Sequence, residues 1–136
     1  MEMDILFLDA NVLFSAAYRN QSGLLQLWSL KTVKLITSLY AAEEARRNLK
    51  QDEQKERLES LLSKMSITAL EHNQQLIPPN ITLPTKDQPI LSAAIASQAT
   101  HLITGDYKDF GHYYNQTIAG VTILPPAEYL ALMQKF

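Results

Sequence analysis

The stretch Asp4–Asp9 constrains the fold of this chain more than any other. Apolar side chains run without a break over Ile5–Leu8 and end in the carboxylate of Asp9, and a second apolar segment with small residues follows Asn11. A continuous apolar run this short is typical of a strand buried on both faces, as in a parallel sheet covered by helices. We therefore expect Asp9 at the carboxyl end of the first strand, where open α/β sheets place their ligand sites.

Strand and helix patterns alternate along the rest of the chain. Further strands are predicted over 33–37, 66–70, 101–104 and 121–124, and helices over 12–18, 24–30, 39–50, 51–65, 88–99 and 127–136. Residues 71–85 and 107–116 have the composition of irregular connections. Because short connections join the alternating elements, the pattern predicts a three-layer α/β/α domain over residues 1–136, with a central, mainly parallel sheet.

Composition excludes several classes of protein. The chain has 136 residues, with 46% apolar and 19% charged residues, which excludes a disordered or fibrous chain. The formal charge of −2 excludes a generally basic binder of nucleic acid, and the lack of cysteine excludes disulfides and thiolate zinc sites. The start has acids where a secretory signal carries positive charge, and no apolar run approaches 18 residues. We expect a soluble, cytoplasmic protein without membrane association.

Acidic residues recur at positions that one α/β fold brings together. They are Asp9 and Asp106 at strand ends, Glu43 or Glu44 early in the helix after the second strand, Asp87 at a helix start, and Asp109 as a possible fifth acid. Clustered carboxylates repel one another unless a cation neutralises them or their pKa values rise. An all-oxygen cluster selects Mg²⁺ or Mn²⁺, and its usual chemistry is in-line hydrolysis of a phosphodiester by activated water. The set predicts a metal-dependent nuclease.

Each acid also has a purely structural interpretation. Asp87 is well placed to cap the helix that follows it, and Asp106 after Gly105 suits a turn. Glu43 and Glu44 suit the first turns of a helix, where the macrodipole favours acids. A helical wheel does not decide which of these two glutamates faces a site.

The remaining polar and aromatic residues carry a weaker signal. Basic residues between Arg46 and Arg57 alternate with acids, which favours a solvated helix face over a phosphate-binding patch. His101 and His112 are expected to be structural. Trp28 and the pair Tyr113–Tyr114 are suited to stacking on bases, but core packing is the favoured interpretation.

Four motifs, taken in order, resemble one known family, the PIN domains. They are Leu8–Leu13 (LDANVL), Glu44–Leu49 (EARRNL), Lys86–Leu91 (KDQPIL) with Ala94, and Leu102–Asp106 (LITGD) with Asp109 and Phe110. The resemblance continues into Val121–Leu130 and so spans essentially the whole chain. It is strongest to the small stand-alone prokaryotic members, many of which are VapC-like toxins of type II toxin-antitoxin pairs.

This resemblance implies an endoribonuclease that depends on Mg²⁺ or Mn²⁺, with RNA as substrate, a cognate antitoxin and a homodimeric state. The family's acidic positions correspond to Asp9, Glu44, Asp87 and Asp106, and its polar supporting positions to Asn11 and Thr104. Glu44 is preferred over Glu43 because Leu49 follows it at the family's spacing. We expect Asp9 and Asp106 to ligate the metal, Glu44 and Asp87 to complete its shell, and Thr104 or Asn11 to orient the attacking water. The role of Asp109 and the number of ions stay open.

Two other classes of function compete with the nuclease. A haloacid-dehalogenase-like phosphatase also uses a strand-end aspartate and Mg²⁺, but it requires a second acid at the position where this chain has Asn11. A receiver domain requires an acidic pair near its start and a lysine after a late strand, and neither pattern is present. A non-catalytic PIN-like binding module keeps the acids for structure or partner contacts, and it stays open as an alternative.

Overall fold

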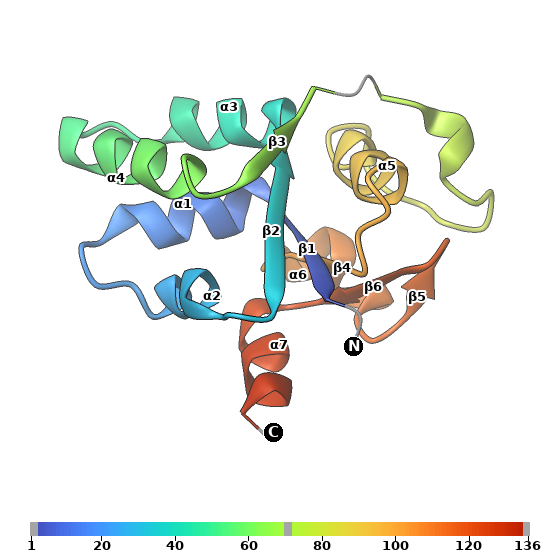
Figure 1. Ribbon diagram of the computed structural model, residues 1–136. Helices are drawn as coiled ribbons and strands as arrows, with labels where there is room; N and C mark the ends of the chain where they lie inside the picture. The colour runs from blue at the N-terminus through green and yellow to red at the C-terminus, as the bar shows by residue number, and fades with distance from the viewer. Residues whose placement is uncertain (1–2, 70–71, 135–136) are drawn as a thin grey trace.

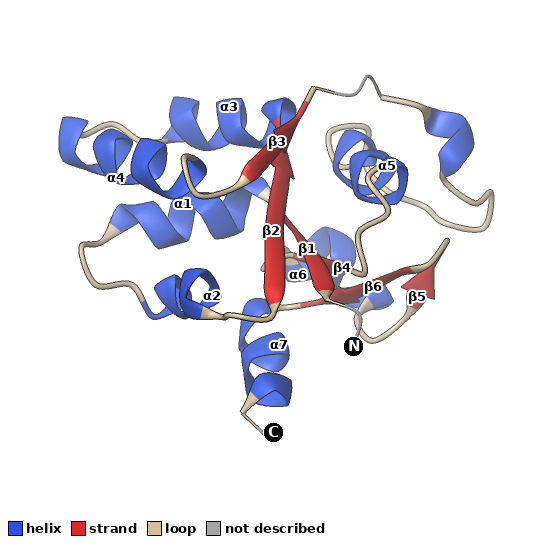
Figure 2. Ribbon diagram, viewed as in Figure 1, coloured by secondary structure: helices blue, strands red, loops and turns tan. Residues whose placement is uncertain are grey.

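A mixed six-stranded sheet forms the centre of the computed structural model, which describes residues 3–69 and 72–134. Its strands are β1 (Asp4–Leu8), β2 (Val33–Ser38), β3 (Ser66–Thr68), β4 (His101–Ile103), β5 (Thr117–Ile118) and β6 (Val121–Leu124). The strand order is β3-β2-β1-β4-β6-β5, and all neighbours are parallel except the antiparallel pair β5–β6. Figure 2 shows the strands in red between the helices. The predicted mainly parallel sheet is confirmed.

Helices cover the sheet in two layers. They are α1 (Ala10–Tyr18), α2 (Gln26–Ser29), α3 (Leu39–Asn48), α4 (Asp52–Leu62), α5 (Gln88–Ala96), α6 (Tyr107–Phe110) and α7 (Pro126–Met133), with single 3₁₀ turns at Gly23–Leu25, Gln74–Leu76 and Gly111–Tyr113. In Figure 1, α1, α3 and α4 gather on one side of the sheet and α5 lies on the other. This is the three-layer α/β/α arrangement that the sequence pattern predicts.

The handedness of the crossovers explains the two layers. From β1 the chain moves outward to β2 and then β3, and afterwards it returns across the sheet to β4 on the other side of β1. Parallel crossovers are right-handed, so a reversal of direction across the sheet moves the connecting helix to the opposite face. The reversal leaves a crevice at the carboxyl ends of β1 and β4, where α/β sheets bind ligands.

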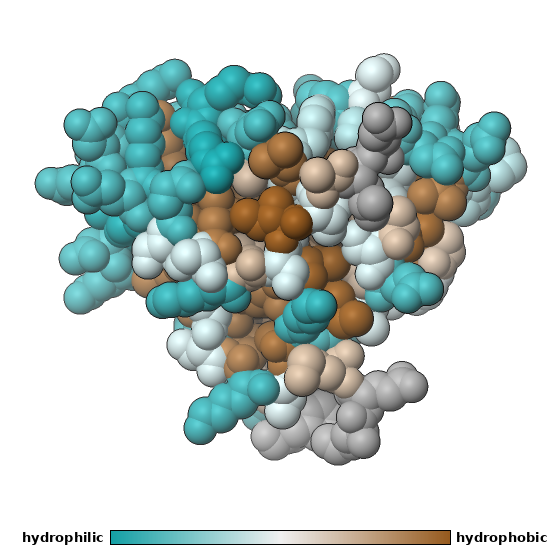
Figure 3. Space-filling model, turned by 45° about the horizontal axis from the view of Figure 1, so that its top comes forward, coloured by the Kyte–Doolittle hydropathy of each residue, from teal (hydrophilic) through white to brown (hydrophobic). Residues whose placement is uncertain are grey.

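The core lies on both faces of β1. Leu6, Phe7 and Leu8 are fully buried, as expected for a central strand covered by two helical layers. The alanines of α1, α3 and α5 allow these helices to pack closely, and most of them are buried. The outer faces of α3 and α4 are hydrophilic and form the teal area at the upper left of Figure 3.

Several predicted elements end earlier than expected. The helix predicted over 39–50 ends at Asn48, the one over 51–65 is Asp52–Leu62, and the strand over 66–70 is Ser66–Thr68, with residue 70 outside the described part of the chain. The helix over 88–99 ends at Ala96, because Gln98 has a φ of 57°, in the left-handed region that a helix cannot continue through. The closing helix covers Pro126–Met133, and residues 135–136 are not described.

One prediction about local structure is wrong, and one short strand is missed. Residues 107–116 are not irregular throughout, because Asp106 caps α6 by accepting a hydrogen bond from the backbone NH of Asp109 at 3.1 Å. The short strand β5 was not predicted, since its turn uses Ala119 (φ 50°) and Gly120 (φ 87°) rather than an Asn-Gly pair. Among the described helices, none is long and apolar enough to cross a membrane.

Candidate metal site at the edge of the sheet

The end of β1 fixes the first acid. The backbone NH of Asp9 donates to the carbonyl of Ile103 at 3.0 Å, which continues the β1–β4 pairing to the last residue before α1. The side chain then caps α1, because Oδ1 accepts a hydrogen bond from the NH of Ala10 at 2.7 Å. The sheet and the helix together hold this carboxylate at the edge, where the sequence predicts it.

Thr104 and Asn11 hold the other oxygen of Asp9. The Thr104 hydroxyl donates to Asp9 Oδ2 at 2.8 Å, and the Asn11 amide donates to the same atom at 3.0 Å. Asn11 Oδ1 accepts from the NH of Gly105 at 2.8 Å, and Thr104 Oγ1 accepts from the NH of Asp106 at 3.1 Å. Thr104 is fully buried. These bonds fix the orientation of the Asp9 carboxylate at the end of β1.

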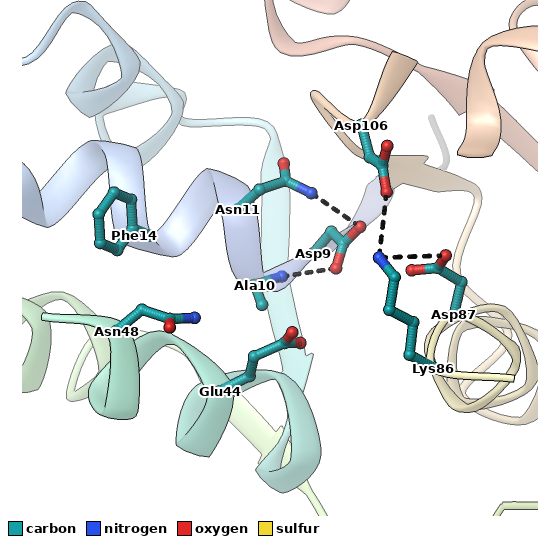
Figure 4. Close-up of a pocket in the computed structure, with 9 residues that line it drawn as sticks. All are labelled: Asp9, Ala10, Asn11, Phe14, Glu44, Asn48, Lys86, Asp87 and Asp106. Atoms are coloured by element: carbon teal, nitrogen blue, oxygen red, sulfur yellow. Dashed lines mark hydrogen bonds and ion pairs between the residues drawn. The ribbon is translucent and has the colours of Figure 1, made fainter. Parts of the chain in front are cut away.

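Acids from four parts of the chain face one pocket of about 330 Å³. Its walls are Asp9, Ala10, Asn11, Phe14, Glu44, Asn48, Lys86, Asp87 and Asp106. Figure 4 shows Glu44 rising from α3 toward Asp9, with Asp87 and Asp106 on the opposite side. The pocket therefore gathers the four predicted acids. Glu43 is exposed, so Glu44 is the glutamate that reaches the pocket.

Asp87 does not act as the helix cap that its position suggests. It occupies the N-cap position of α5, but its side chain makes no capping hydrogen bond. Its Oδ2 atom is buried and accepts no hydrogen bond from any described residue. A buried carboxylate oxygen without a donor is costly. The structural interpretation of Asp87 as a simple cap is therefore wrong.

Asp109 joins the cluster more closely than the sequence indicates. One carboxylate oxygen each from Asp87, Asp106 and Asp109 lies within 4.8 Å of the other two. Asp109 reaches this position because Asp106 begins the short helix α6 and turns the chain back. The acid whose role the sequence left open is thus beside Asp87 and Asp106.

Lys86 is a charged residue of the site to which the sequence analysis assigned no role. Its Nζ lies 3.2 Å from Asp109 Oδ2, 3.6 Å from Asp87 Oδ2 and 4.0 Å from Asp106 Oδ2. Its side chain is 62% exposed, so the stem approaches the carboxylates from solvent. Its only sequence signal is its place next to Asp87 in the KDQPIL motif.

Burial and neighbouring carboxylates shift the pKa values of the acids in the pocket. Burial, together with the charges of Glu44 and Asp106, raises the pKa of Asp9 to about 6, against the hydrogen bonds from Thr104 and Ala10. Burial and the contact with Asp109 raise the pKa of Asp87 to about 7. The pKa of Asp109 is lowered by its contacts with Asp87 and Lys86. These carboxylates favour either protons or a cation at neutral pH.

The donor set fits a hard divalent cation. All the acidic side chains at the pocket offer oxygen atoms, and Asp87 Oδ2, which has no hydrogen bond, lies among them. Mg²⁺ and Mn²⁺ favour carboxylate oxygen ligands. A bound cation would relieve the repulsion that remains beside the Lys86 ammonium, which lies 3.6 Å from this oxygen without a hydrogen bond.

Other residues singled out in the sequence have structural partners away from the pocket. Arg46 forms a two-bond ion pair with Glu59, with distances of 2.7 and 3.0 Å, which agrees with the solvated-face interpretation. The indole NH of Trp28 donates to the carbonyl of Leu61 at 3.2 Å. His101 packs edge-on against Tyr129 at 5.1 Å between ring centroids. The structural interpretation holds for Trp28 and His101.

Comparison with solved structures shows the same fold in proteins of low identity. A toxin-antitoxin complex from Klebsiella pneumoniae is 22% identical, with 89% of this chain and 97% of that chain covered and a TM-score of 0.65. FitAcB from Neisseria gonorrhoeae is 23% identical, with coverages of 90% and 98% and a TM-score of 0.62. VapC20 of Mycobacterium tuberculosis, a toxin that cleaves the Sarcin-Ricin loop, is 12% identical, with coverages of 75% and 92% and a TM-score of 0.55.

Comparison with curated protein sequences gives no match. A family model described as the PIN domain matches residues 6–108, from β1 to the start of α6, and includes Asp9, Glu44, Asp87 and Asp106. The residues beyond this match complete the same sheet with β6 and β5. Since this family model matches well over half of the chain, the chain belongs to the PIN-domain family.

Proposed function

We propose that this protein is an endoribonuclease that depends on Mg²⁺ or Mn²⁺ and hydrolyses RNA phosphodiester bonds. The observation that carries the proposal is Asp87 Oδ2, buried without a hydrogen bond in a pocket that also gathers Asp9, Glu44 and Asp106. Such a group of oxygens is unfavourable without a cation and suited to one. The family membership of the chain supports the same chemistry.

Each residue has a proposed task. Asp9 and Asp106 bind the cation directly, and Glu44 and Asp87 complete its surroundings directly or through water. Asp109, which lies beside Asp87 and Asp106, is a further ligand. Asn11 and Thr104 act as positioning residues that hold Asp9 in its orientation.

A divalent cation at such a site lowers the pKa of bound water and offsets the negative charge that develops on the phosphodiester. The residues of the chain supply a fixed edge against which the scissile phosphate is aligned. Because water attacks and the ribose 2′-hydroxyl does not, the products carry 5′-phosphate and 3′-hydroxyl ends.

The biological setting we propose is that of a toxin in a toxin-antitoxin pair. Proteins with the same fold include the toxin-antitoxin complex from Klebsiella pneumoniae and the Sarcin-Ricin loop cleaving toxin VapC20. We extend this to a cognate antitoxin, a homodimer and a cytoplasmic location for the present chain.

The test is cleavage of a mixed panel of single-stranded and hairpin RNAs with Mn²⁺, Mg²⁺ or EDTA. We expect metal-dependent cleavage by the wild type and a loss of about 10³-fold or more in the Asp9→Asn, Asp106→Asn double variant. The matched control is Asp4→Asn, which makes the same chemical change at the other end of β1 and should leave cleavage intact. Cleavage by the double variant at the wild-type rate would refute the assigned roles.

The second candidate function is a non-catalytic binding module, and the position of Lys86 favours it. An ammonium within 4.0 Å of three carboxylates neutralises part of their charge without a metal ion. For this alternative, no RNA of the panel is cleaved, and calorimetry detects no binding of Mn²⁺.

A further inference from the structure

The exposed face of α1 carries aromatic residues beyond the carboxylates. Asn11, Phe14 and Tyr18 follow one another at spacings of three and four residues, so they lie along one side of the helix. Phe14 lines the carboxylate pocket, and Figure 4 shows its ring beside Asn11 and Asn48. The same side chain lines a second hollow of about 250 Å³, farther along α1. Phe14 is thus a wall of both hollows.

This second hollow combines flat apolar rings with a polar rim. Its walls are Phe14, Ser15, Tyr18, Arg19, Gln21, Ser22 and Gly23. The rings of Phe14 and Tyr18 are 5.4 Å apart between centroids and tilted by 36°. Tyr18 is 50% exposed, although an aromatic ring at the end of a helix has ample apolar surface to bury. The hollow is therefore an aromatic surface open to solvent beside the cluster of acids.

Helix α4 fixes the end of α1 that carries Tyr18. Arg57 donates to the carbonyl of Ala17 at 2.9 Å and to that of Tyr18 at 3.1 Å, and Gln54 donates to the carbonyl of Tyr18 at 3.3 Å. These bonds satisfy carbonyls that a helix end leaves free and place a positive charge at its C-terminus. The aromatic surface is thereby held rigidly relative to the pocket, about 10 Å along the helix from Asn11 to Tyr18.

We propose that the hollow formed by Phe14 and Tyr18 is a stacking site for a nucleobase of single-stranded RNA, next to the phosphate that lies at the carboxylates. The proposal rests on the nuclease function proposed above, and it identifies the part of the RNA substrate that the enzyme binds. Phe14 is a wall of both hollows. An RNA strand whose phosphate lies at the carboxylates therefore places the neighbouring base at the second hollow, where the rings of Phe14 and Tyr18 are suited to stacking. Arg19 at the rim supplies a cation for the backbone of that nucleotide.

Single-stranded RNA fits this surface better than a duplex does. Bases of a single strand are free to stack on aromatic side chains, whereas bases in a helix are already stacked on one another. Stacking tolerates all four bases, since each has a π-face. The site therefore predicts preference for unpaired segments without a strict sequence requirement.

The first experiment measures binding separately from cleavage. Fluorescence anisotropy of a labelled single-stranded oligoribonucleotide is recorded with full-length protein in the Asp9→Asn, Asp106→Asn background, with Mg²⁺ present. Adding Tyr18→Leu, which keeps an apolar side chain but removes the ring, should weaken binding by roughly 5- to 50-fold. Tyr18→Phe, which keeps the ring, should restore binding. Leu132→Ala, at an exposed apolar residue of α7, is the distant control.

The second experiment identifies stacking as the cause. A single abasic site is moved along the oligonucleotide, and binding by the inactive protein is compared with and without the Tyr18→Leu substitution. At one position the difference between the two proteins should vanish, because the base that stacks is missing there. Phe14→Leu should show the same coupling at that position, and its circular-dichroism melting curve reports separately whether it folds.

The outcomes separate the two proposals. If the wild type cleaves RNA with metal while Tyr18→Leu and Phe14→Leu bind and cleave as it does, the stacking site is wrong and the nuclease stands. If the wild type neither binds nor cleaves any RNA, both proposals fall. Equal weakening at every abasic position, with no coupling to Tyr18, also overturns the stacking site.

Discussion

The two ends of strand β1 each carry an aspartate, and their surroundings differ. Asp4 begins the strand, and its Oδ2 accepts a 2.7 Å hydrogen bond from the phenol of Tyr129 on α7. Asp9 follows the strand and accepts bonds from Ala10, Asn11 and Thr104. Asp9 therefore has more donors than Asp4, and the neighbouring charges differ as well: the structure gives Asp4 a neutral partner, whereas the charges of Glu44 and Asp106 act on Asp9.

The pKa shifts at the two ends reflect this contrast. At the Asp4 end, burial and the carboxylate raise the pKa of Tyr129, and burial lowers the pKa of His101, so both rings stay neutral at pH 7. At the Asp9 end, burial and like charges raise the pKa of the acid itself. Both aspartates accept hydrogen bonds from neutral donors, so the other carboxylates near Asp9 are what make it a ligand candidate.

The largest expected effect is on the pH dependence of stability without metal. Asp9 has a pKa of about 6 in the folded state, against 3.8 for a freely exposed aspartate, so the folded state binds its proton more tightly. Its contribution to stability is present below pH 3.8 and is lost as the pH rises to 6, a loss of about 3 kcal/mol. Urea unfolding in EDTA over about pH 4 to 7.5 should show this slope in the wild type and a flatter one in Asp9→Asn.

Added Mn²⁺ at about pH 7.5 should raise the stability of the wild type, because a cation that binds only the folded protein stabilises it. Asp4→Asn should keep the wild-type slope. If Asp4→Asn flattens the pH dependence of stability as much as Asp9→Asn does, the proposed difference between the two ends of β1 is wrong.

A smaller effect should come from the structural end of the strand. Tyr129→Phe removes the phenol that donates to Asp4 and should lower the free energy of unfolding by about 1 to 2 kcal/mol. RNA cleavage under metal saturation should stay within about twofold of the wild type, because Tyr129 does not line the carboxylate pocket. A double-mutant cycle with Asp4→Ala isolates the interaction, and a loss of cleavage in Tyr129→Phe would show that the two ends are coupled.

The smallest effect concerns Lys86. Because its ammonium is exposed, Lys86→Met should lower the stability of the metal-free protein by less than about 1 kcal/mol. It should also tighten Mn²⁺ binding severalfold in isothermal titration calorimetry, since the ammonium competes with the cation for Asp87 and Asp109. Lys108→Met is the control with the same change in net charge, and weaker Mn²⁺ binding in Lys86→Met would contradict this competition.

The strand-end acids were predictable because two strong local signals coincide. A buried apolar strand followed directly by an acid marks Asp9, the apolar strand before Gly105 marks Asp106, and parallel strands bring their ends together. Lys86 was not predictable in this way, because its approach to Asp109 depends on the turn before α5, in which the NH of Asp87 bonds to the carbonyl of Pro84 at 2.9 Å. Such a distance arises from tertiary structure.

Other side chains were also placed incorrectly from the sequence, because their partners come from distant parts of the chain. The sequence pattern indicates that Asp87 caps α5, but the tertiary fold turns its carboxylate into the pocket. Leu39 has the helical spacing of the buried Ala42, Ala45 and Leu49, yet it is 42% exposed because it is the first residue of α3. Residues at the ends of elements depend most on what packs against them.

The hydroxyl of Thr104 is a hydrogen-bond partner of both strand-end acids. One oxygen atom donates to the side chain of Asp9 and accepts from the backbone NH of Asp106, and it is itself fixed by a fully buried residue at the end of β4. The position of the Asp106 backbone relative to the Asp9 carboxylate is therefore fixed by one buried hydroxyl. The central strands β1 and β4 therefore set the geometry that the proposed cation would meet.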